Sequence, residues 1–214
     1  MARKTTAKKS AGIELLRRKT VYRGGFKIEQ VRLRHRGHDG TWTEPYLREV
    51  FERGHAVAIL PYDPRLDRVV LIEQIRVPAL LAKRNPRQIE IAAGIIEAGE
   101  TPRAVARREL MEETGLRARK LRRLFSFLPS PGVMTETIEI YLAEVDASNA
   151  TGQHGLASEH EEIRVFAVPA QEAFRLVERG IVENGAALLA LQWLALHHDN
   201  LRGQVRLPAK RQPR

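Results

Sequence analysis

The segment from Gly94 to Leu116 constrains this chain more than any other part of its sequence. Thr101 and Pro102 form a typical helix start, in which a capping residue is followed by proline at the first helical position. Gly115 is a typical helix end, because glycine adopts the left-handed backbone conformation at little cost. We therefore predict one helix that begins at Pro102 and stops before Gly115.

Three carboxylates lie along this predicted helix, at Glu109, Glu112 and Glu113. Their spacing places them within about 100° of arc, and like charges so close destabilise an isolated helix by roughly 0.2–0.5 kcal/mol per pair. Val105 and Ala106 fall on the same side, so the face is not purely polar. A hard divalent cation would make the cluster favourable, and an all-oxygen ligand set indicates Mg²⁺ or Mn²⁺.

Helical periodicity alone leaves a second interpretation open, in which the glutamates form a solvated acidic face. In that case Arg103, Arg107 and Arg108 would act as their helix partners. The spacing of residues over the whole segment from Gly94 to Leu116 favours the metal site over the solvated face. The segment reads glycine, five residues, glutamate, seven residues, then Arg-Glu-apolar-x-Glu-Glu-x-Gly-apolar, and chance agreement with such a pattern is on the order of one in 10⁷ per start position.

This spacing resembles the box of the Nudix hydrolases at every fixed position. The resemblance implies an α/β fold, an α/β/α sandwich with a mixed sheet, whose loop–helix–loop box binds Mg²⁺. It also implies cleavage of a nucleoside diphosphate linked to another group. In family terms the metal ligands would be Glu109, Glu112, Glu113 and the carbonyl of Ala93, and Arg108 would orient a glutamate.

The remaining sequence predicts two folded regions between basic tails. Residues 20–50 alternate apolar and polar side chains, broken by glycine-rich turns, which predicts a small antiparallel β unit. We expect a basic tail over 1–19, a β domain over 20–53, a larger domain over 54–198 and a second basic tail over 199–214. In the larger domain we expect a hairpin of two buried strands near 55–60 and 68–75, and further strands near 89–93, 121–128, 136–144 and 163–167. We also expect a polar loop over 146–162 and helices near 170–179 and 185–198.

Composition excludes several classes of protein. The chain has no cysteine, which excludes disulfide frameworks and thiolate metal sites. Its net charge of +10 is concentrated at residues 1–25 and 202–214, so the segment between them is slightly acidic. A specific nucleic-acid-binding domain would carry positive charge on its folded body, and we expect neither that function nor a membrane span. We expect a soluble, cytoplasmic protein.

A narrower resemblance begins downstream of the box. Pro131 stands sixteen residues after Gly115, where a Pro-Gly turn would be an ordinary strand end. Beside a complete box this proline resembles the marker of the ADP-ribose pyrophosphatases, and residues 20–198 as a whole are similar to the bacterial members of that group. The resemblance implies a homodimer in which the N-terminal β domain is exchanged between protomers.

The same resemblance assigns roles in the acidic loop and to two arginines. Glu159 matches the general base and Glu161 a further metal ligand, with Glu112 as the rival base. Arg53 and Arg76 would contact the diphosphate by charge-assisted hydrogen bonds. The alternative is that these arginines form surface ion pairs instead.

Further residues carried over from the resemblance surround the rest of the substrate. Arg48, Glu49, Ser130 and Glu136 would lie near the terminal ribose and phosphates. Phe26 would stack on adenine, with Tyr22 as the other available ring in that segment.

The resulting functional prediction is Mg²⁺-dependent hydrolysis of ADP-ribose to AMP and ribose 5-phosphate, with Mn²⁺ able to replace Mg²⁺. One alternative is hydrolysis of another nucleotide sugar, such as GDP-mannose, by the same groups. A non-catalytic regulator that binds ADP-ribose is a second, although such a protein does not need all three glutamates. Removal of an RNA cap or 5′-triphosphate is a third, which fits the basic ends but not Pro131.

Overall fold

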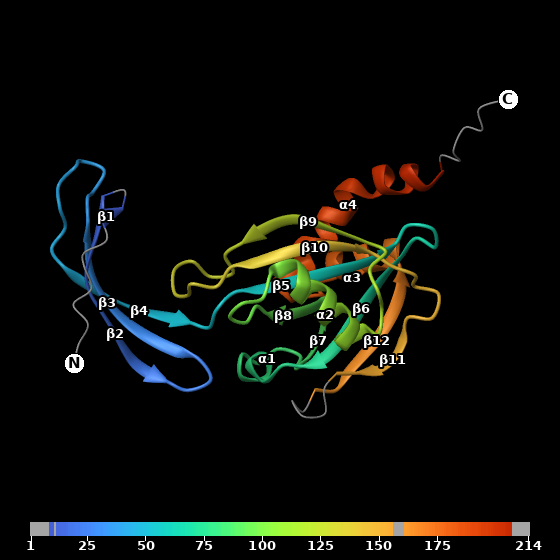
Figure 1. Ribbon diagram of the computed structural model, residues 1–214, viewed down its shortest axis with the longest axis horizontal. Coiled ribbons are helices and arrows are strands. Elements are labelled where there is room, and N and C mark those ends of the chain that lie inside the picture. Colours follow the sequence, from blue (N-terminus) through green and yellow to red (C-terminus); the bar gives the residue numbers. More distant parts are fainter. Residues whose placement is uncertain (1–8, 11, 156–160, 207–214) are drawn as a thin grey trace. The chain divides into compact units, whose positions relative to one another are not determined.

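The computed structural model describes residues 9–10, 12–155 and 161–206. The chain forms two compact units (Figure 1). The smaller unit contains the residues up to His55 together with Leu128–Thr137, and the larger contains Ala56–Phe127 and the residues from Ile138 onward. The segment Leu128–Thr137 thus joins the smaller unit, although its sequence position places it in the middle of the larger one.

A four-stranded antiparallel sheet makes up most of the smaller unit, as the alternating pattern predicts. Its second strand begins at Ile13, inside the range expected to be a tail, because Ile13 and Leu15 pair with His35 and Leu33 of the next strand. The Leu128–Thr137 segment is attached by two backbone hydrogen bonds to Phe51. The strands are β1 (Lys9–Ser10), β2 (Ile13–Arg23), β3 (Lys27–His35) and β4 (Tyr46–Glu52).

The larger unit is built on a mixed eight-stranded sheet. Its main path runs β11-β12-β6-β5-β10-β9, with β7 beside β6 and β8 beside β5. Strand β10 is parallel to β5 and the other pairs are antiparallel. The strands are β5 (Ala56–Asp63), β6 (Arg68–Ile75), β7 (Arg87–Glu90), β8 (Ala92–Ile95), β9 (Lys120–Phe127), β10 (Ile138–Glu144), β11 (Thr151–His154) and β12 (Ile163–Pro169).

The hairpin predicted from β5 and β6 forms only next to its turn. The two strands pair at Tyr62 with Val69 and at Asp63 with Arg68, and then separate. Further along, β8 pairs with β5 and β7 pairs with β6. The single strand predicted near 89–93 is therefore two short strands, because its two halves hydrogen-bond to different neighbours.

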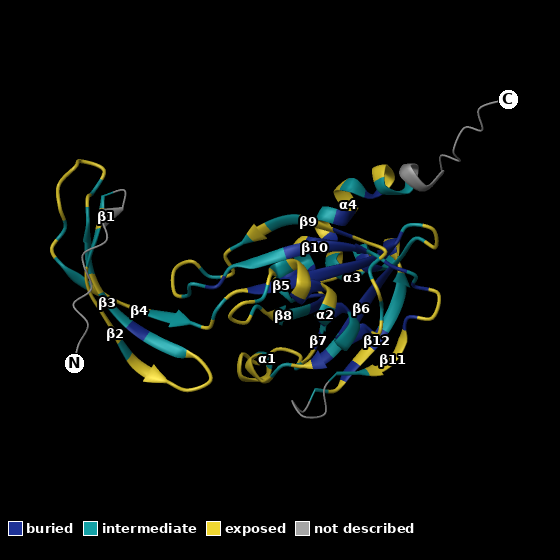
Figure 2. Ribbon diagram, viewed as in Figure 1, coloured by how far each residue is buried: buried dark blue, intermediate teal, exposed yellow. Residues whose placement is uncertain are grey.

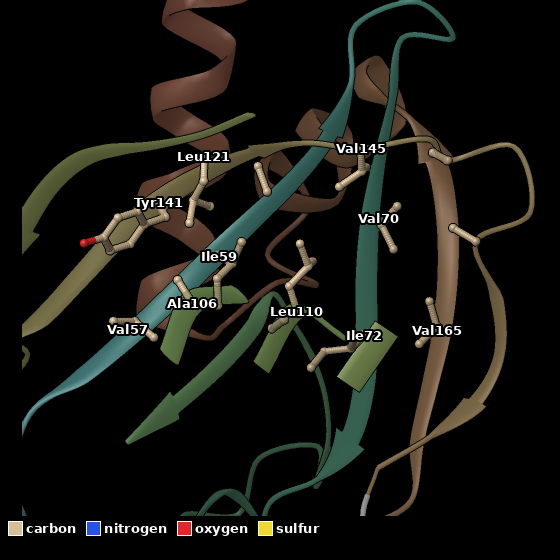
Figure 3. Close-up of a cluster of buried hydrophobic side chains, with 14 of the residues drawn as sticks. Val57, Ile59, Val70, Ile72, Ala106, Leu110, Leu121, Tyr141, Val145 and Val165 are labelled. Atoms are coloured by element: carbon tan, nitrogen blue, oxygen red, sulfur yellow. The ribbon is translucent and has the colours of Figure 1, made fainter. Parts of the chain in front are cut away.

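Helices cover both faces of the larger sheet, which confirms the α/β/α sandwich. On one face, Val57 and Ile59 pack against α2 (Pro102–Thr114) (Figure 3). The alternate residues Ala58 and Leu60 pack on the other face, against α3 (Ala170–Glu178) and α4 (Gly185–Arg206). Buried positions accordingly concentrate on the central strands (Figure 2).

Three details of the larger unit differ from the sequence predictions. A short helix, α1 (Val77–Leu81), follows β6 without any periodic signal, and none of its residues is buried. Strand β11 lies within the segment predicted to be a polar loop. It is an edge strand that pairs with β12, and its residues are mostly exposed, so they lack the apolar pattern that predicts a strand. Helix α4 continues past residue 198 to Arg206, and Arg202 reaches Asp67 by an ion pair. Among the described residues no helix has the length and hydropathy that crossing a bilayer requires.

Candidate active site

Helix α2 carries the predicted carboxylates and has the ends that the sequence predicts. The side chain of Thr101 accepts a hydrogen bond from the amide of Ala104, and Gly115 closes the helix with a φ of 69°. The buried side chains Ala106 and Leu110 fix the helix on the sheet (Figure 3). This packing determines which glutamates turn inward.

Two of the three glutamates are buried rather than solvated. Glu109 is 9% exposed and Glu113 is 4% exposed, whereas Glu112 is only partly covered. The alternative interpretation of a fully solvated acidic face is therefore wrong for Glu109 and Glu113. Buried carboxylates need a compensating partner, because removing a charge from water is costly.

Burial and mutual repulsion raise the pKa of both inner carboxyls. Desolvation raises the pKa of Glu113 to about 8, helped by the charges of Glu109 and Glu161 and opposed by the amide of Ala93. Desolvation likewise raises the pKa of Glu109 to about 7, against the lowering effect of Arg108. These are the conditions in which a divalent cation bound between carboxylates is most favourable.

The strand before the box approaches the helix closely. The amide of Ala93 in β8 donates a hydrogen bond of 2.8 Å to Oε2 of Glu113. At the next position, a Cβ atom on Gly94 would collide with the side chain of Glu109. Glycine at this box position therefore leaves room for the Glu109 side chain beside the β8 backbone.

Arg108 lies among the carboxylates of the box. Its Nη1 atom is 2.7 Å from Oε1 of Glu109 and 2.9 Å from Oε2 of Glu112. Its Nε atom is 3.4 Å from Glu100, which also accepts a hydrogen bond from the amide of Glu97. The guanidinium thus orients two box glutamates and ties them to the loop before the helix.

A second arginine and a distant glutamate also lie near this cluster. The Arg76 guanidinium forms two hydrogen bonds with Glu90, of 2.9 and 2.8 Å. The hydrogen bonds and charge of Glu90 raise the pKa of Arg76 most, and the charges of Glu113 and Glu161 raise it further. Glu161, almost fifty residues beyond the helix, is therefore brought to the box by the fold.

The smaller unit holds the other predicted substrate contacts. A hollow of about 410 Å³ is lined by Phe26 and Arg53, among others. Phe26 packs edge-on to Phe51 with ring centroids 4.6 Å apart, and Nε of Arg53 lies 3.4 Å from Glu136. The full lining is Arg18, Gly24, Gly25, Phe26, Lys27, Glu29, Glu52, Arg53 and Gly54.

The remaining predicted contacts of this unit do not line the hollow. The Arg48 guanidinium lies 4.4 Å from the ring centroid of Tyr46, and Glu49 is exposed on β4. Ser130 uses its carbonyl to accept two backbone hydrogen bonds in the turn at Leu128–Thr137. The ring of Tyr22 is the alternative to that of Phe26, and the two ring centroids lie 5.7 Å apart.

Glu159, the predicted general base, lies outside the described residues. Within the described ranges, no three acidic or histidine side chains converge closely enough to hold one ion, and Arg108 instead pairs with Glu109 and Glu112. The chemistry of the donors nevertheless fits a hard cation, since they are all oxygens and two of them are buried carboxylates.

A model of the NUDIX domain matches residues 52–189, well over half of the chain. The chain belongs to the Nudix family. Nudix hydrolases generally use a divalent metal ion, which agrees with the oxygen donors around α2. The matched range starts at the end of β4, so the strands of the smaller unit precede it.

Curated relatives cover most of the chain beyond the Nudix domain itself. The ADP-ribose pyrophosphatase of Escherichia coli strain K12 is 47% identical over 192 residues, which is 90% of this chain and 92% of that protein. The ADP-ribose pyrophosphatase of Haemophilus influenzae is 38% identical over 192 residues, 88% of each chain. The GDP-mannose pyrophosphatase of Cronobacter sakazakii is 34% identical over 189 residues, 87% of this chain and 97% of that protein.

A solved structure has a similar fold. The crystal structure of an ADP compounds hydrolase is 25% identical to this chain, with a TM-score of 0.67. The matched region covers 94% of this chain and 100% of the chain in that structure. The similarity therefore extends over both units.

Sequence reasoning missed one charged residue next to the site, Glu90. It is 3% exposed and is the only acidic residue in the otherwise uncharged stretch from Gln88 to Ala93. A lone carboxylate in a buried strand requires a partner, and this signal could have identified it. Its partner, Arg76, is fourteen residues earlier, so only the pairing of β6 with β7 reveals the contact.

Proposed function

We propose that this chain hydrolyses the diphosphate of ADP-ribose to AMP and ribose 5-phosphate in a reaction that requires Mg²⁺, for which Mn²⁺ can substitute. One observation carries the proposal: Glu109 and Glu113 are buried on the box helix of a Nudix domain, and the charge of Glu113 acts on Arg76. Relatives named ADP-ribose pyrophosphatase, up to 47% identical over nine-tenths of the chain, support the choice of substrate.

The proposed metal ligands are the carboxylates of Glu109, Glu112, Glu113 and Glu161 and the carbonyl of Ala93. When bound, Mg²⁺ neutralises diphosphate oxygens and makes phosphorus more electrophilic. Arg108 already holds the carboxylates of Glu109 and Glu112 in place, so its role would be to orient them.

The attacking water must lose a proton as it approaches phosphorus. We assign this proton to Glu159 rather than to Glu112. A carboxylate bound to Mg²⁺ is a poor base, because the cation stabilises its ionised form. Glu112 would bind metal and is already paired with Arg108, whereas Glu159 would be left to accept the proton.

Arginines from the two units would bind the anionic part of the substrate. Arg76 would contact the diphosphate at the carboxylate cluster, and Arg53 would contact it from the hollow of the smaller unit. Phe26 lines that hollow and offers a ring for stacking on adenine. Arg48, Glu49, Ser130 and Glu136 would surround the terminal ribose and phosphates.

The functional form that we propose is a homodimer in which the smaller unit is exchanged between protomers. The sheet of this unit leaves large apolar side chains exposed, such as Leu47 at 51% and Val21 at 47%. A single sheet without a covering layer is marginally stable. A second copy of the chain would cover this surface and bring Arg53 to the partner's box.

The decisive experiment measures Mg²⁺-dependent turnover of ADP-ribose, with the products identified by mass. We expect AMP and ribose 5-phosphate. GDP-mannose belongs in the same panel, because relatives 34% identical bear that name, and faster turnover of GDP-mannose would contradict the proposed substrate. Tight ADP-ribose binding without turnover would instead identify a regulator.

A further inference from the structure

Glu90 holds Arg76 by a two-pronged ion pair. Nε of Arg76 lies 2.9 Å from Oε1 and Nη2 lies 2.8 Å from Oε2, so one edge of the guanidinium uses both carboxylate oxygens. The Glu90 side chain is 4% exposed, whereas that of Arg76 is 43% exposed. Among the described residues no third group accepts a hydrogen bond from this guanidinium. The ion pair therefore fixes one edge and leaves the opposite edge accessible.

The sheet register places this pair on the face that carries α2. Glu90 lies directly opposite Ile72 across the β6–β7 ladder, and directly opposed residues point to the same face of a sheet. Ile72 packs in the core beneath α2 (Figure 3). The effect of the Glu113 and Glu161 charges on the pKa of Arg76 agrees with this placement.

A stabilising role does not explain why a carboxylate is buried at this position. Replacing a buried ion pair by apolar residues of similar size is often neutral or stabilising, and the neighbouring residues Ile89 and Ile91 are apolar. The negative charge of Glu90 also works against binding of an anion by Arg76. Any benefit to diphosphate binding must therefore come from geometry.

We propose that Glu90 is a positioning residue that directs the accessible edge of the Arg76 guanidinium toward the diphosphate of the substrate. The inference rests on the proposed function, in which Arg76 contacts that diphosphate. A planar guanidinium held along one edge can present its remaining N–H groups in a fixed orientation, which a flexible ammonium cannot do.

The substitution Glu90→Gln separates geometry from charge, because the two effects change KM in opposite directions. If geometry dominates, loss of the two-pronged pair raises KM for ADP-ribose about tenfold, with kcat changed less than threefold. If charge dominates, removing a negative group near the anion lowers KM. A lowered or unchanged KM would overturn the proposal. Equilibrium binding of a non-hydrolysable ADP-ribose analogue should weaken by the same factor.

Glu73→Gln is the matched control, because Glu73 forms a similar two-pronged pair with Arg164, at 3.1 and 3.1 Å. Glu73 adjoins Ile72 in β6 and therefore points to the opposite face of the sheet. We expect its KM and analogue affinity to remain those of the wild type. Equal increases in KM from both substitutions would indicate a general loss of sheet structure and overturn the proposal.

Two further variants keep the inference falsifiable if Glu90→Gln does not fold. Glu90→Asp keeps the charge but shortens the reach, and should also raise KM severalfold. Arg76→Lys keeps the positive charge without the fork, and its effect on KM should not add to that of Glu90→Asp in the double variant. Additive effects would overturn the inference. Failure of the proposed function is distinguishable, because the wild type itself would then not turn over ADP-ribose.

Discussion

All of the buried apolar side chains in the described part of the chain belong to the larger unit, whereas the two buried residues of the smaller unit, Glu29 and Glu136, are both carboxylates. The larger sheet is covered by helices on both faces, and its strands are buried accordingly. The smaller sheet has backbone ladders and ion pairs, such as those of Arg18 with Glu29 and Glu52. Regular strand pairing therefore does not by itself provide a hydrophobic core.

The contrast suggests a division of labour. The larger unit is stable enough to hold two carboxylates, Glu109 and Glu113, in a buried and mutually repulsive arrangement. The smaller unit offers arginines, aromatic rings and a hollow, but its described residues form no buried apolar core. We therefore expect the larger unit to carry the catalytic groups and the smaller unit to complete the active site of a partner chain.

The largest effect should follow loss of a metal ligand in the larger unit. Glu113→Gln removes charge at nearly constant shape, and we expect kcat/KM for ADP-ribose to fall by about 10²–10⁴ with a higher Mg²⁺ requirement. Excess chelator should abolish wild-type turnover while circular dichroism remains unchanged. Full activity in excess chelator would contradict the proposed chemistry.

A comparable loss of rate should follow removal of the proposed base. Glu159→Gln should lower kcat by about 10²–10⁴ with KM nearly unchanged, the range typical of general-base removal. Glu161→Gln is the comparison, since a lost ligand should raise the Mg²⁺ requirement instead. If Glu159→Gln keeps more than about a tenth of the wild-type kcat, Glu112 becomes the better candidate for the base.

Truncation of one leucine in each unit tests the difference in packing directly. Leu110→Ala should cost about 2–5 kcal/mol of unfolding free energy, because Leu110 is fully buried where α2 packs against the sheet. Leu47→Ala, at a position 51% exposed, should cost no more than about 0.5 kcal/mol in a monomer. Chemical denaturation at several protein concentrations distinguishes a Leu47 that is exposed in a monomer from one that a second copy of the chain covers. A larger, concentration-dependent cost for Leu47→Ala would show that a second copy covers it.

A smaller effect on stability should depend on pH. Burial alone would raise the pKa of Asp67, but hydrogen bonds from His198 and Tyr62 and the charge of Arg202 outweigh it and lower the pKa below its ordinary value. The group therefore stabilises the fold above the unfolded pKa of about 3.9, and this contribution is lost as pH falls through the folded pKa. Asp67→Asn should cost roughly 1–3 kcal/mol at pH 7 and less near pH 3. An equal cost at both pH values would contradict the role of the charge.

The smallest signal should come from mixing two inactive variants, one in each unit. If each site needs both protomers, equal mixing of Arg53→Ala and Glu113→Gln should restore about a quarter of wild-type activity through heterodimers with one intact site. Each variant alone serves as the control. No recovery after complete subunit exchange, or an active monomer, would contradict the exchanged dimer.

The sequence by itself determined the elements whose signals are local. The capping residue Thr101, the following proline and the helix-ending Gly115 fixed α2 to within a residue. The spacing of the whole segment from Gly94 to Leu116, rather than that of its three glutamates alone, indicated the chemistry and the family. The continuous apolar runs of β5 and β6 predicted buried strands, and the fold buries both faces of these strands. Such signals depend only on neighbours along the chain, so they can be recognised without knowledge of the tertiary structure.

Only the tertiary structure decided which groups meet and which are buried. The helix period alone could not determine that Glu109 and Glu113 turn inward, because this depends on how Leu110 packs against the sheet. The split of one predicted strand into β7 and β8 depends on their separate partners. The pair of Arg76 with Glu90 likewise exists because β6 and β7 are in register. Contacts between distant segments follow from burial and pairing of the whole chain, which no local pattern encodes.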